Sequence, residues 1–285
     1  MKLYRSGPPG AETPIIEIDS VLYDATPVGD FTPEFWAEGG PRRLGEMALR
    51  GRLRGIEPAE GERLGSPVAS AHAVICIGQN YAAHAAESGA EPPAQPILFL
   101  ETPNTIAGPD DDVTIPAGSE KTDWEVELGI VIGKRSYALS DTEEAAAAIG
   151  GYVLVNDLSE RAFQLEVSGG QWSKGKCCPG YLPLGPWVVT ADEFDPSNVG
   201  LRSFVNGEPR QNSTTADMIF DCPRIVYDLS QYMQLEAGDV ICTGTPEGVA
   251  LSGRFPYLRD GDTVRVEIDG LGAQEQRFRA AEVAR

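Results

Sequence analysis

The chain has 285 residues, 41% of them hydrophobic, and its 43 acidic residues outnumber its 23 basic ones, which gives a formal net charge of −20. This composition can form a hydrophobic core, which excludes a wholly disordered chain, and the negative charge argues against binding to nucleic acids or anionic membranes. Because no apolar run is long enough to span a bilayer and the amino terminus lacks a secretion signal, we expect a cytoplasmic protein.

We predict a small N-terminal region over residues 1–68, followed by a catalytic domain over residues 69–285. Within the first region, alternating residues predict a strand at 14–24, and a short helix is expected within 31–53. Residues 56–67 are polar and contain Pro and Gly, which is typical of a linker.

Short apolar runs alternate with turn residues in the rest of the chain. An Ala-rich helix at 80–90, ending at Gly89, is followed later by a helix at 141–150 with Asp141 as its N-cap. Strands are predicted at residues 73–78, 96–100, 124–133, 151–157, 186–190, 200–207, 239–248, 263–270 and 273–283, and a polar connection at 108–123. Because strands and helices do not alternate regularly, we expect a β-rich α+β fold and not a doubly wound sheet.

Acidic side chains gather at two of these strands. Glu125 and Glu127 are two residues apart, so a strand would place them on one face with Cα atoms about 7 Å apart, where they repel each other unless solvated or holding a cation. Asp157, at the end of the next strand, would complete a three-carboxylate oxygen site that suits Mg²⁺ or Mn²⁺ and not Zn²⁺. A solvent-facing strand edge and a helix cap formed by Asn156 and Asp157 are the alternatives.

Residues in three further segments could act on a substrate. His84 and Glu87 are neighbours on a helix face, so Glu87 could orient the imidazole as a base, although such pairs are also common on surfaces. Lys176 lies in a glycine-containing loop where it could meet an anion or be a solvated charge. After residue 238, small residues could offer backbone N–H groups and the Thr245 hydroxyl to a carboxylate, or form an ordinary turn.

In this order, these segments resemble the fumarylacetoacetate hydrolase family from about residue 73 to 278. The motifs that carry the resemblance are IGQNYAAHAAE, DWEVELGIVIGK, GYVLVNDLSERAFQ, LPLGPWVVT, VNGEPRQNSTTADMIF and GDVICTGTPEGV. The resemblance is greatest to bacterial branches that cleave 2,4-diketo-3-deoxy sugar acids. It implies a mixed β-roll or flattened barrel, usually in a homodimer.

The resemblance also implies roles for individual residues. Glu125, Glu127 and Asp157 are expected to hold Mg²⁺ or Mn²⁺, and His84 with Glu87 to activate water. The substrate and its oxyanion are expected to contact Arg161, Gln164 and Lys176, and its carboxylate to contact Thr245.

The expected reaction is metal-dependent hydrolysis of a carbon–carbon bond in a 2,4-diketo acid, either an acylpyruvate or a 2,4-diketo-3-deoxy sugar acid, to give pyruvate and a second acid. Decarboxylation, hydration or tautomerisation of a related keto acid is the alternative, and a non-catalytic protein that binds a metal and an acid is another. Two departures from the family pattern bear on the substrate. Glu101 stands where relatives carry Lys, which would disfavour a second substrate carboxylate, and Cys177-Cys178-Pro179 replaces a segment that usually contains Asp.

Overall fold

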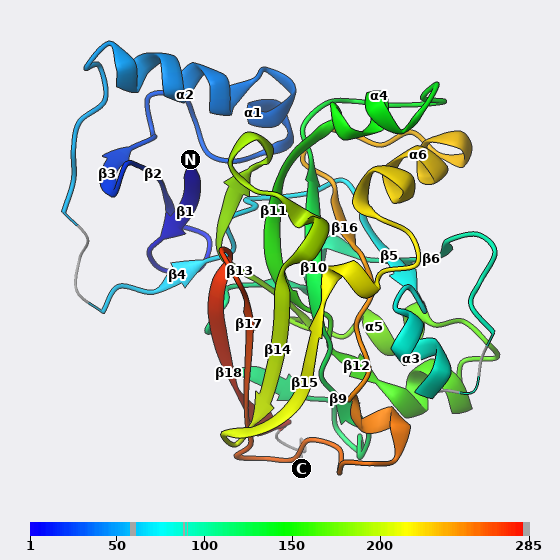
Figure 1. The fold of residues 1–285 in the computed structure, drawn as a ribbon. Helices are drawn as coiled ribbons and strands as arrows, with labels where there is room; N and C mark the ends of the chain where they lie inside the picture. Colours follow the sequence, from blue (N-terminus) through cyan, green and yellow to red (C-terminus); the bar gives the residue numbers. More distant parts are fainter. Residues whose placement is uncertain (58–60, 88, 90, 282–285) are drawn as a thin grey trace.

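The computed structural model describes residues 1–57, 61–87, 89 and 91–281, so parts of the predicted linker, of the helix at 80–90 and of the last strand lie outside the described residues. The largest sheet has the order β3-β2-β1-β13-β11-β10-β16-β5-β6, with β4 paired to β1 and β7 to β13 (Figure 1). Its strands are β1 (Lys2–Ser6), β2 (Thr13–Ile18), β3 (Val21–Asp24), β4 (Leu64–Gly65), β5 (Val74–Gly78), β6 (Ile97–Glu101), β7 (Ile106–Ala107), β10 (Val126–Ile132), β11 (Ile149–Asn156), β13 (Leu182–Thr190) and β16 (Val240–Cys242).

A second sheet covers one face of the first (Figure 1). Its order is β15-β14-β17-β18-β8, and a separate short ladder joins β12 to β9. These strands are β8 (Val113–Ile115), β9 (Thr122–Asp123), β12 (Ser159–Glu160), β14 (Gly200–Val205), β15 (Glu208–Thr214), β17 (Thr263–Ile268) and β18 (Gly272–Ala280). Every residue of β10 is buried, because one face packs against the second sheet and the other against the core beneath the N-terminal strands.

Short helices close the ends of the sheets. They are α1 (Pro33–Ala37), α2 (Gly40–Leu49), α3 (Ala82–Glu87), α4 (Thr142–Ala146), α5 (Ser173–Lys176) and α6 (Cys222–Tyr232). Single turns form η1 (Pro103–Thr105), the π-helical η2 (Ala162–Glu166), η3 (Ala191–Glu193), η4 (Pro196–Asn198), η5 (Thr215–Asp217) and η6 (Ala250–Ser252). Helices α3 and α5 lie on the same side of the molecule as β9 and β12, away from α4 and α6 (Figure 1). No helix of the described residues is long and apolar enough to cross a membrane.

The β-rich α+β fold class is confirmed, and several element boundaries differ from the predictions. The helix within 31–53 is in fact two helices, because Gly39 between them adopts a left-handed conformation with φ of 67°. Asp141 does cap α4, accepting from the Glu144 N–H at 2.8 Å, but the helix ends at Ala146 because β11 already begins at Ile149. Helix α6 was not predicted, although its buried Ile225, Val226 and Leu229 follow helical spacing.

The N-terminal strands continue the main sheet through the pairing of β1 with β13, where Lys2 is opposite Val189. Residues on both sides of position 68 therefore share one sheet, and the division into two domains at this position stays a prediction. The edge of the sheet at the opposite end is β6, where Leu98 and Leu100 are 39% and 44% exposed. A homodimer likewise stays a prediction.

Arg63 joins the N-terminal strands to the segment before β8, and its removal should weaken the fold in a pH-dependent way. Its guanidinium donates to Glu12 at 3.0 Å and to both Asp111 oxygens at 2.6 Å. Partial burial raises the pKa of these two carboxyls, but the hydrogen bonds and charge of Arg63, together with backbone hydrogen bonds and, for Glu12, the charge of Arg5, outweigh burial and lower it. A depressed folded pKa stabilises the protein above the unfolded value of about 4 and loses that contribution as the pH falls through the folded value.

We therefore expect Arg63→Met to lower the free energy of unfolding by about 1 kcal/mol at pH 7, a figure reduced for solvent screening. The difference from wild type should begin to shrink as the pH falls below about 4, where the carboxyls of the unfolded chain become protonated, and should vanish only below their depressed folded pKa values. Urea unfolding at pH 7 and pH 3.5 measures this, with Arg42→Met as the control because, among the residues that the structure describes, Arg42 forms an ion pair only with Glu46 on the exposed face of its helix. An equal loss at both pH values would contradict the expectation.

Candidate active site

A cavity of about 470 Å³ opens beside the end of β5 and the start of β10. Its wall contains eight of the nine predicted site residues: His84, Glu87, Glu125, Glu127, Arg161, Gln164, Lys176 and Thr245. The ninth, Asp157, lies directly behind this wall and is 1% exposed. Residues separated by up to 161 positions in the chain therefore meet at one cavity, and their roles there remain predictions.

The three predicted metal ligands lie together. Glu125, Glu127 and Asp157 each offer a carboxylate oxygen, and these oxygens lie within 4.8 Å of one another. The sequence predicted Glu125 to lie within the strand, but β10 begins one residue later, at Val126. The Glu125 carbonyl accepts from the Asp157 N–H at 2.9 Å. Because β10 and β11 pair antiparallel with Val126 opposite Asn156, the start of one strand and the end of the other present their acids to the same point.

Two buried cations compensate Glu125. Lys176 Nζ lies 2.6 Å from Glu125 Oε2, and Arg161 Nη2 lies 2.7 Å from Glu125 Oε1. Burial by itself raises the pKa of Glu125, but the charges of Lys176 and Arg161 outweigh it and lower the pKa to about 2. Glu125 is therefore ionised over the whole physiological range.

Glu127 has a different environment. Its Oε2 accepts from the Gly244 N–H at 2.8 Å, and no Lys or Arg of the described residues forms an ion pair with it. Burial, and next the charge of Asp157, raise the pKa of Glu127 well above its usual range. Burial also raises the pKa of Asp157, against the opposing charge of Lys176. Carboxylates held this close favour either protonation or a shared cation.

The donor set fits a divalent cation that prefers oxygen. All three carboxylates are buried, they come from different chain segments, and Asp157 Oδ1 accepts no hydrogen bond from the described residues, although Lys176 Nζ is 3.0 Å away. Three carboxylates at one wall of a cavity leave room for substrate oxygens and water. Glu125, Glu127 and Asp157 are therefore the residues that would hold such an ion.

His84 lies on α3, whose start is anchored by Asn80. The buried Asn80 side chain donates to the Phe220 and Thr243 carbonyls at 3.0 and 2.8 Å. His84 Nδ1 lies 3.8 Å from Glu87 Oε2, too far for a hydrogen bond, and it has no hydrogen-bond partner among the described residues. Glu87 is itself held by the Gly248 N–H at 3.1 Å and by Arg254 at 2.8 Å. His84 and Glu87 thus both lie at the cavity, but they are not hydrogen-bonded to each other.

The three predicted substrate donors differ in how many hydrogens remain for a ligand. Lys176 directs its ammonium to Glu125 Oε2, to the Asp157 carbonyl at 2.9 Å and toward Asp157 Oδ1. Arg161 uses three of its five N–H groups on Asp123, Glu125 and Gln164. Because Gln164 Oε1 accepts from Arg161 at 2.9 Å, its Nε2 is left as a donor for a ligand. Lys176 therefore mainly positions the acids, whereas Arg161 and Gln164 retain donors.

Asp123 was not assigned a role from the sequence. It is fully buried, accepts from Arg161 Nε at 2.8 Å, and also accepts from the backbone N–H groups of Ala250 and Leu251. It therefore orients Arg161 and ties the loop after β16 to the cavity. Its position just before the acidic pair was the only sequence signal for this residue.

The loop after β16 makes several contacts within the protein, and its predicted contact with a substrate carboxylate stays a prediction. The Thr245 hydroxyl donates to the Val126 carbonyl at 3.0 Å and accepts from Gln211 Nε2 at 2.8 Å. The Gly244 and Gly248 N–H groups already donate to carboxylates of the protein, those of Glu127 and Glu87. Since a hydroxyl has one hydrogen, Thr245 could donate to a substrate carboxylate only by giving up Val126.

Glu101 lies behind the cavity wall and not in it. It is 4% exposed, and no N–H or hydroxyl group of the described residues donates to its oxygens, which lie within hydrogen-bond reach of the Asp157 carboxyl. Burial, and next the charge of Asp157, raise the pKa of Glu101 well above its usual range. Cys178, in the other departure from the family pattern, is buried, and burial raises the pKa of its thiol to about 11, as expected for a packing residue.

Close packing behind Lys176 depends on Gly175. A Cβ atom there would lie 2.5 Å from the Glu160 carbonyl and 2.4 Å from Gln164 Cβ. Any other residue would therefore push α5 away from η2, the two elements that carry Lys176 and Gln164.

The chain is similar to known proteins over almost its whole length. A family model described as "Fumarylacetoacetate (FAA) hydrolase C-terminal" matches residues 73–279. A relative from Burkholderia multivorans, whose name assigns it provisionally to the hydrolases, is 44% identical over 99% of this chain and 100% of its own.

Two solved structures each cover 99% of this chain and 100% of their own at a TM-score of 0.78. One is a 5-carboxymethyl-2-hydroxymuconate delta-isomerase from Mycobacterium smegmatis, at 35% identity. The other is a maleylpyruvate hydrolase from Sphingobium sp. SYK-6 in complex with manganese(II) and pyruvate, at 28% identity.

Proposed function

Since the chain belongs to the fumarylacetoacetate hydrolase family, we propose that it is a divalent-metal-dependent hydrolase that cleaves the C3–C4 bond of a 2,4-diketo acid to give pyruvate and a second carboxylic acid. The observation that carries this proposal is the meeting of three acids, a histidine–glutamate pair and two donors at one cavity. Mg²⁺ or Mn²⁺ is the proposed ion, and the similarity to a manganese complex supports the choice of class.

When bound, the cation would supply Lewis-acid stabilisation for negative charge on the keto-acid oxygens. The chain's own residues would do the rest. Arg161 and Gln164 have N–H groups left for the C4 oxygen, and removing one such donor typically costs about 3–4 kcal/mol of transition-state stabilisation. Lys176 and Arg161 keep Glu125 ionised, so one ligand remains charged whatever the protonation of its neighbours.

His84 is the proposed base. It would take a proton from water, which adds to C4, and the C3–C4 bonding electrons would move onto the pyruvate fragment, whose C3 then accepts a proton. Glu87 would stabilise the protonated imidazole. Its Oε2 lies 3.8 Å from His84 Nδ1, so a movement of about 1 Å would bring the two side chains into hydrogen-bond contact. Catalytic contacts of this kind often tighten only when substrate binds.

The cavity also suggests the substrate's tail. Besides the predicted site residues, the wall consists mainly of the apolar side chains of Ile77, Phe99, Leu165, Trp172, Val249 and Leu251, with Gln79 and Ser252 as polar members. A mainly apolar wall stabilises an alkyl or aryl chain and offers few partners to the hydroxyls of a sugar acid. We therefore propose acylpyruvates as the substrates, ahead of 2,4-diketo-3-deoxy sugar acids.

Isomerisation of a related keto acid is the second candidate, because the similar Mycobacterium smegmatis structure is a delta-isomerase. It needs proton transfer between carbons but no attacking water. The two reactions differ in their products, since only hydrolysis releases pyruvate.

The test is a panel of acylpyruvates, 2,4-diketo-3-deoxy sugar acids and unsaturated 2-hydroxy dicarboxylates with Mg²⁺ or Mn²⁺ present. Pyruvate is measured by a coupled dehydrogenase, and isomerisation is followed by ultraviolet absorbance. We expect pyruvate release with the highest kcat/KM for an acylpyruvate. Absorbance changes without pyruvate would instead support the isomerase, and turnover of sugar acids alone would overturn the choice of tail.

A further inference from the structure

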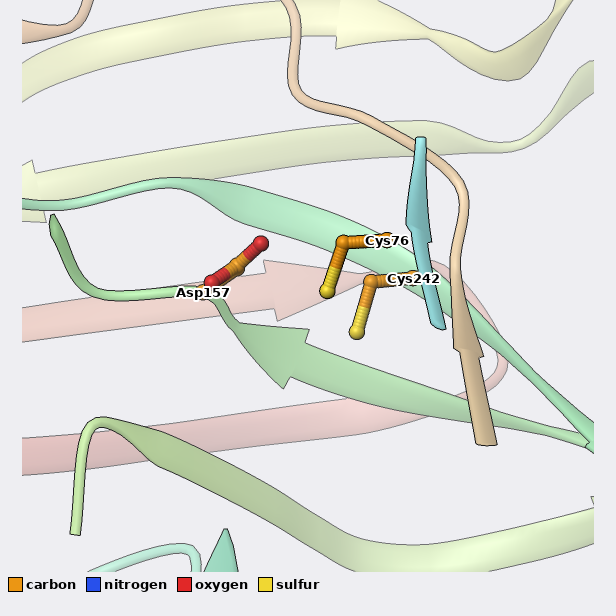
Figure 2. A group of neighbouring side chains, drawn as sticks. All are labelled: Cys76, Asp157 and Cys242. Atoms are coloured by element: carbon orange, nitrogen blue, oxygen red, sulfur yellow. The ribbon is translucent and has the colours of Figure 1, made fainter. Parts of the chain in front are cut away.

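Two cysteines lie side by side beneath the carboxylate site. Cys76 on β5 and Cys242 on β16 are direct partners in the parallel ladder, so their side chains share one face of the sheet. Both thiols are free, with Cys76 1% and Cys242 0% exposed. Figure 2 shows the two sulfur atoms next to each other and the Asp157 carboxylate beside them. One ligand atom from each of the three residues lies within 4.8 Å of the other two.

Glu101 lies on the same face of the sheet as this group. On β6 it is two residues from Phe99, which pairs with Cys76, so Glu101 shares the face of the sheet that carries both cysteines. It is 4% exposed, and neither oxygen accepts from an N–H or hydroxyl group of the described residues. Its carboxyl lies within hydrogen-bond reach of the Asp157 carboxyl, with which it could share a proton or a cation. A buried carboxyl without a donor is costly unless it binds a proton or a cation.

The chemistry of this group differs from that of the cavity. Two sulfurs and two carboxylates form a four-ligand set that suits a thiophilic ion in tetrahedral coordination, whereas Mg²⁺ and Mn²⁺ prefer oxygen. Zn–S bonds of about 2.3 Å and Zn–O bonds of about 2.0 Å place tetrahedral ligand atoms roughly 3.3–3.8 Å apart. The atoms of Cys76, Asp157 and Cys242 already lie within 4.8 Å of one another, so these three ligands need side-chain adjustments of only about 1 Å. Glu101 lies outside this 4.8 Å group and would have to move toward it to become the fourth ligand.

We propose that Cys76, Cys242, Asp157 and Glu101 form a second cation site, selective for a thiophilic divalent ion such as Zn²⁺, that adjoins the three-carboxylate site and shares Asp157 with it. Binding would replace the thiol protons, and any proton on Glu101, which leave to solvent. Lys176 beside Asp157 reduces the negative charge that four ionised ligands would otherwise concentrate there.

The test is optical and needs no substrate, so it succeeds or fails independently of the proposed hydrolase activity. Co²⁺ is titrated into the reduced, metal-free protein with millimolar Mg²⁺ present to occupy the oxygen site. We expect a sulfur-to-cobalt charge-transfer absorption that saturates at one equivalent and disappears when Zn²⁺ is added. The absence of this absorption in folded wild-type protein would overturn the proposal and favour a proton shared by Glu101 and Asp157.

Matched variants locate the site. Cys76→Ser, Cys242→Ser and the double variant should lose the absorption, whereas Cys178→Ser and Cys222→Ser, which change other buried cysteines, should keep it. Glu101→Gln retains both sulfurs and should weaken Co²⁺ binding at least tenfold, which is roughly the lower limit for removing an outer-shell partner. Circular dichroism confirms folding, and if the serine variants fail to fold, Glu101→Gln still decides. An absorption that persists in the folded double variant, or unchanged Co²⁺ affinity in Glu101→Gln, would contradict the assignment.

Discussion

Glu127→Gln should lower kcat at least about 100-fold and weaken binding of Mg²⁺ or Mn²⁺, with little change in stability. Lewis-acid stabilisation by a metal is worth several kcal/mol, and each 1.4 kcal/mol is a factor of ten in rate. The glutamine keeps an oxygen that can accept from the Gly244 N–H, so the loop after β16 stays in place. Turnover, metal affinity by calorimetry and thermal unfolding measure the three parts of this expectation.

Substitution of Glu125 or Asp157 tests metal binding less directly, because each of these carboxylates also lies beside a buried cation. We expect Glu125→Ala and Asp157→Ala to abolish activity as well, but Glu125→Ala leaves Lys176 and Arg161 buried without their shared partner. Removing one member of a buried ion pair typically costs about 3–5 kcal/mol. EDTA should reproduce the loss of activity in wild type, and added Mg²⁺ or Mn²⁺ should restore it. Full turnover after chelation, or in Glu127→Gln, would contradict a metal-dependent reaction.

His84→Ala should lower turnover by about 10²–10⁴, the usual contribution of a general base. Metal affinity should be nearly unchanged, since His84 is not among the three clustered carboxylates. The matched control is His72→Ala, because His72 is the other histidine of the chain, is exposed and does not line the cavity. Near-wild-type turnover of His84→Ala would overturn hydrolysis by this base while leaving the metal site intact.

Glu87→Gln should cost less than His84→Ala and should not add to it in the double variant, because the two residues act as one unit. The substituted amide could still accept from the Gly248 N–H, although it would lose the charge that pairs with Arg254. Comparing kcat and KM for Glu87→Gln and Arg254→Met separates two roles of Glu87. Arg254→Met removes only the contact of Glu87 with the loop after β16, whereas Glu87→Gln also changes the orientation of His84. Strictly additive losses in the double variant would show that the two residues act separately.

Local sequence patterns predicted most strands and the positions of the charged groups. Apolar runs bounded by Gly and polar residues indicated β5, β6, β10 and β11, because each of these strands is short and mostly apolar. The order of the motifs identified the family, and Glu125, Glu127, Asp157 and His84 do meet at one cavity and its rear wall. Boundaries were less predictable, since β10 begins only at Val126 and the helix after Asp141 gives way to β11 before Gly150.

The sequence by itself therefore determined the β-rich fold class, the family and the acidic and basic residues that could do chemistry. Only the tertiary structure decided how those residues share their partners. Asp123 orients Arg161, Gln211 and Val126 occupy the Thr245 hydroxyl, and Glu101 lies with Cys76 and Cys242 behind the cavity. The physical reason is that these contacts depend on which distant strands pair and in which register: residues 76 and 242 become neighbours only because β5 and β16 lie side by side.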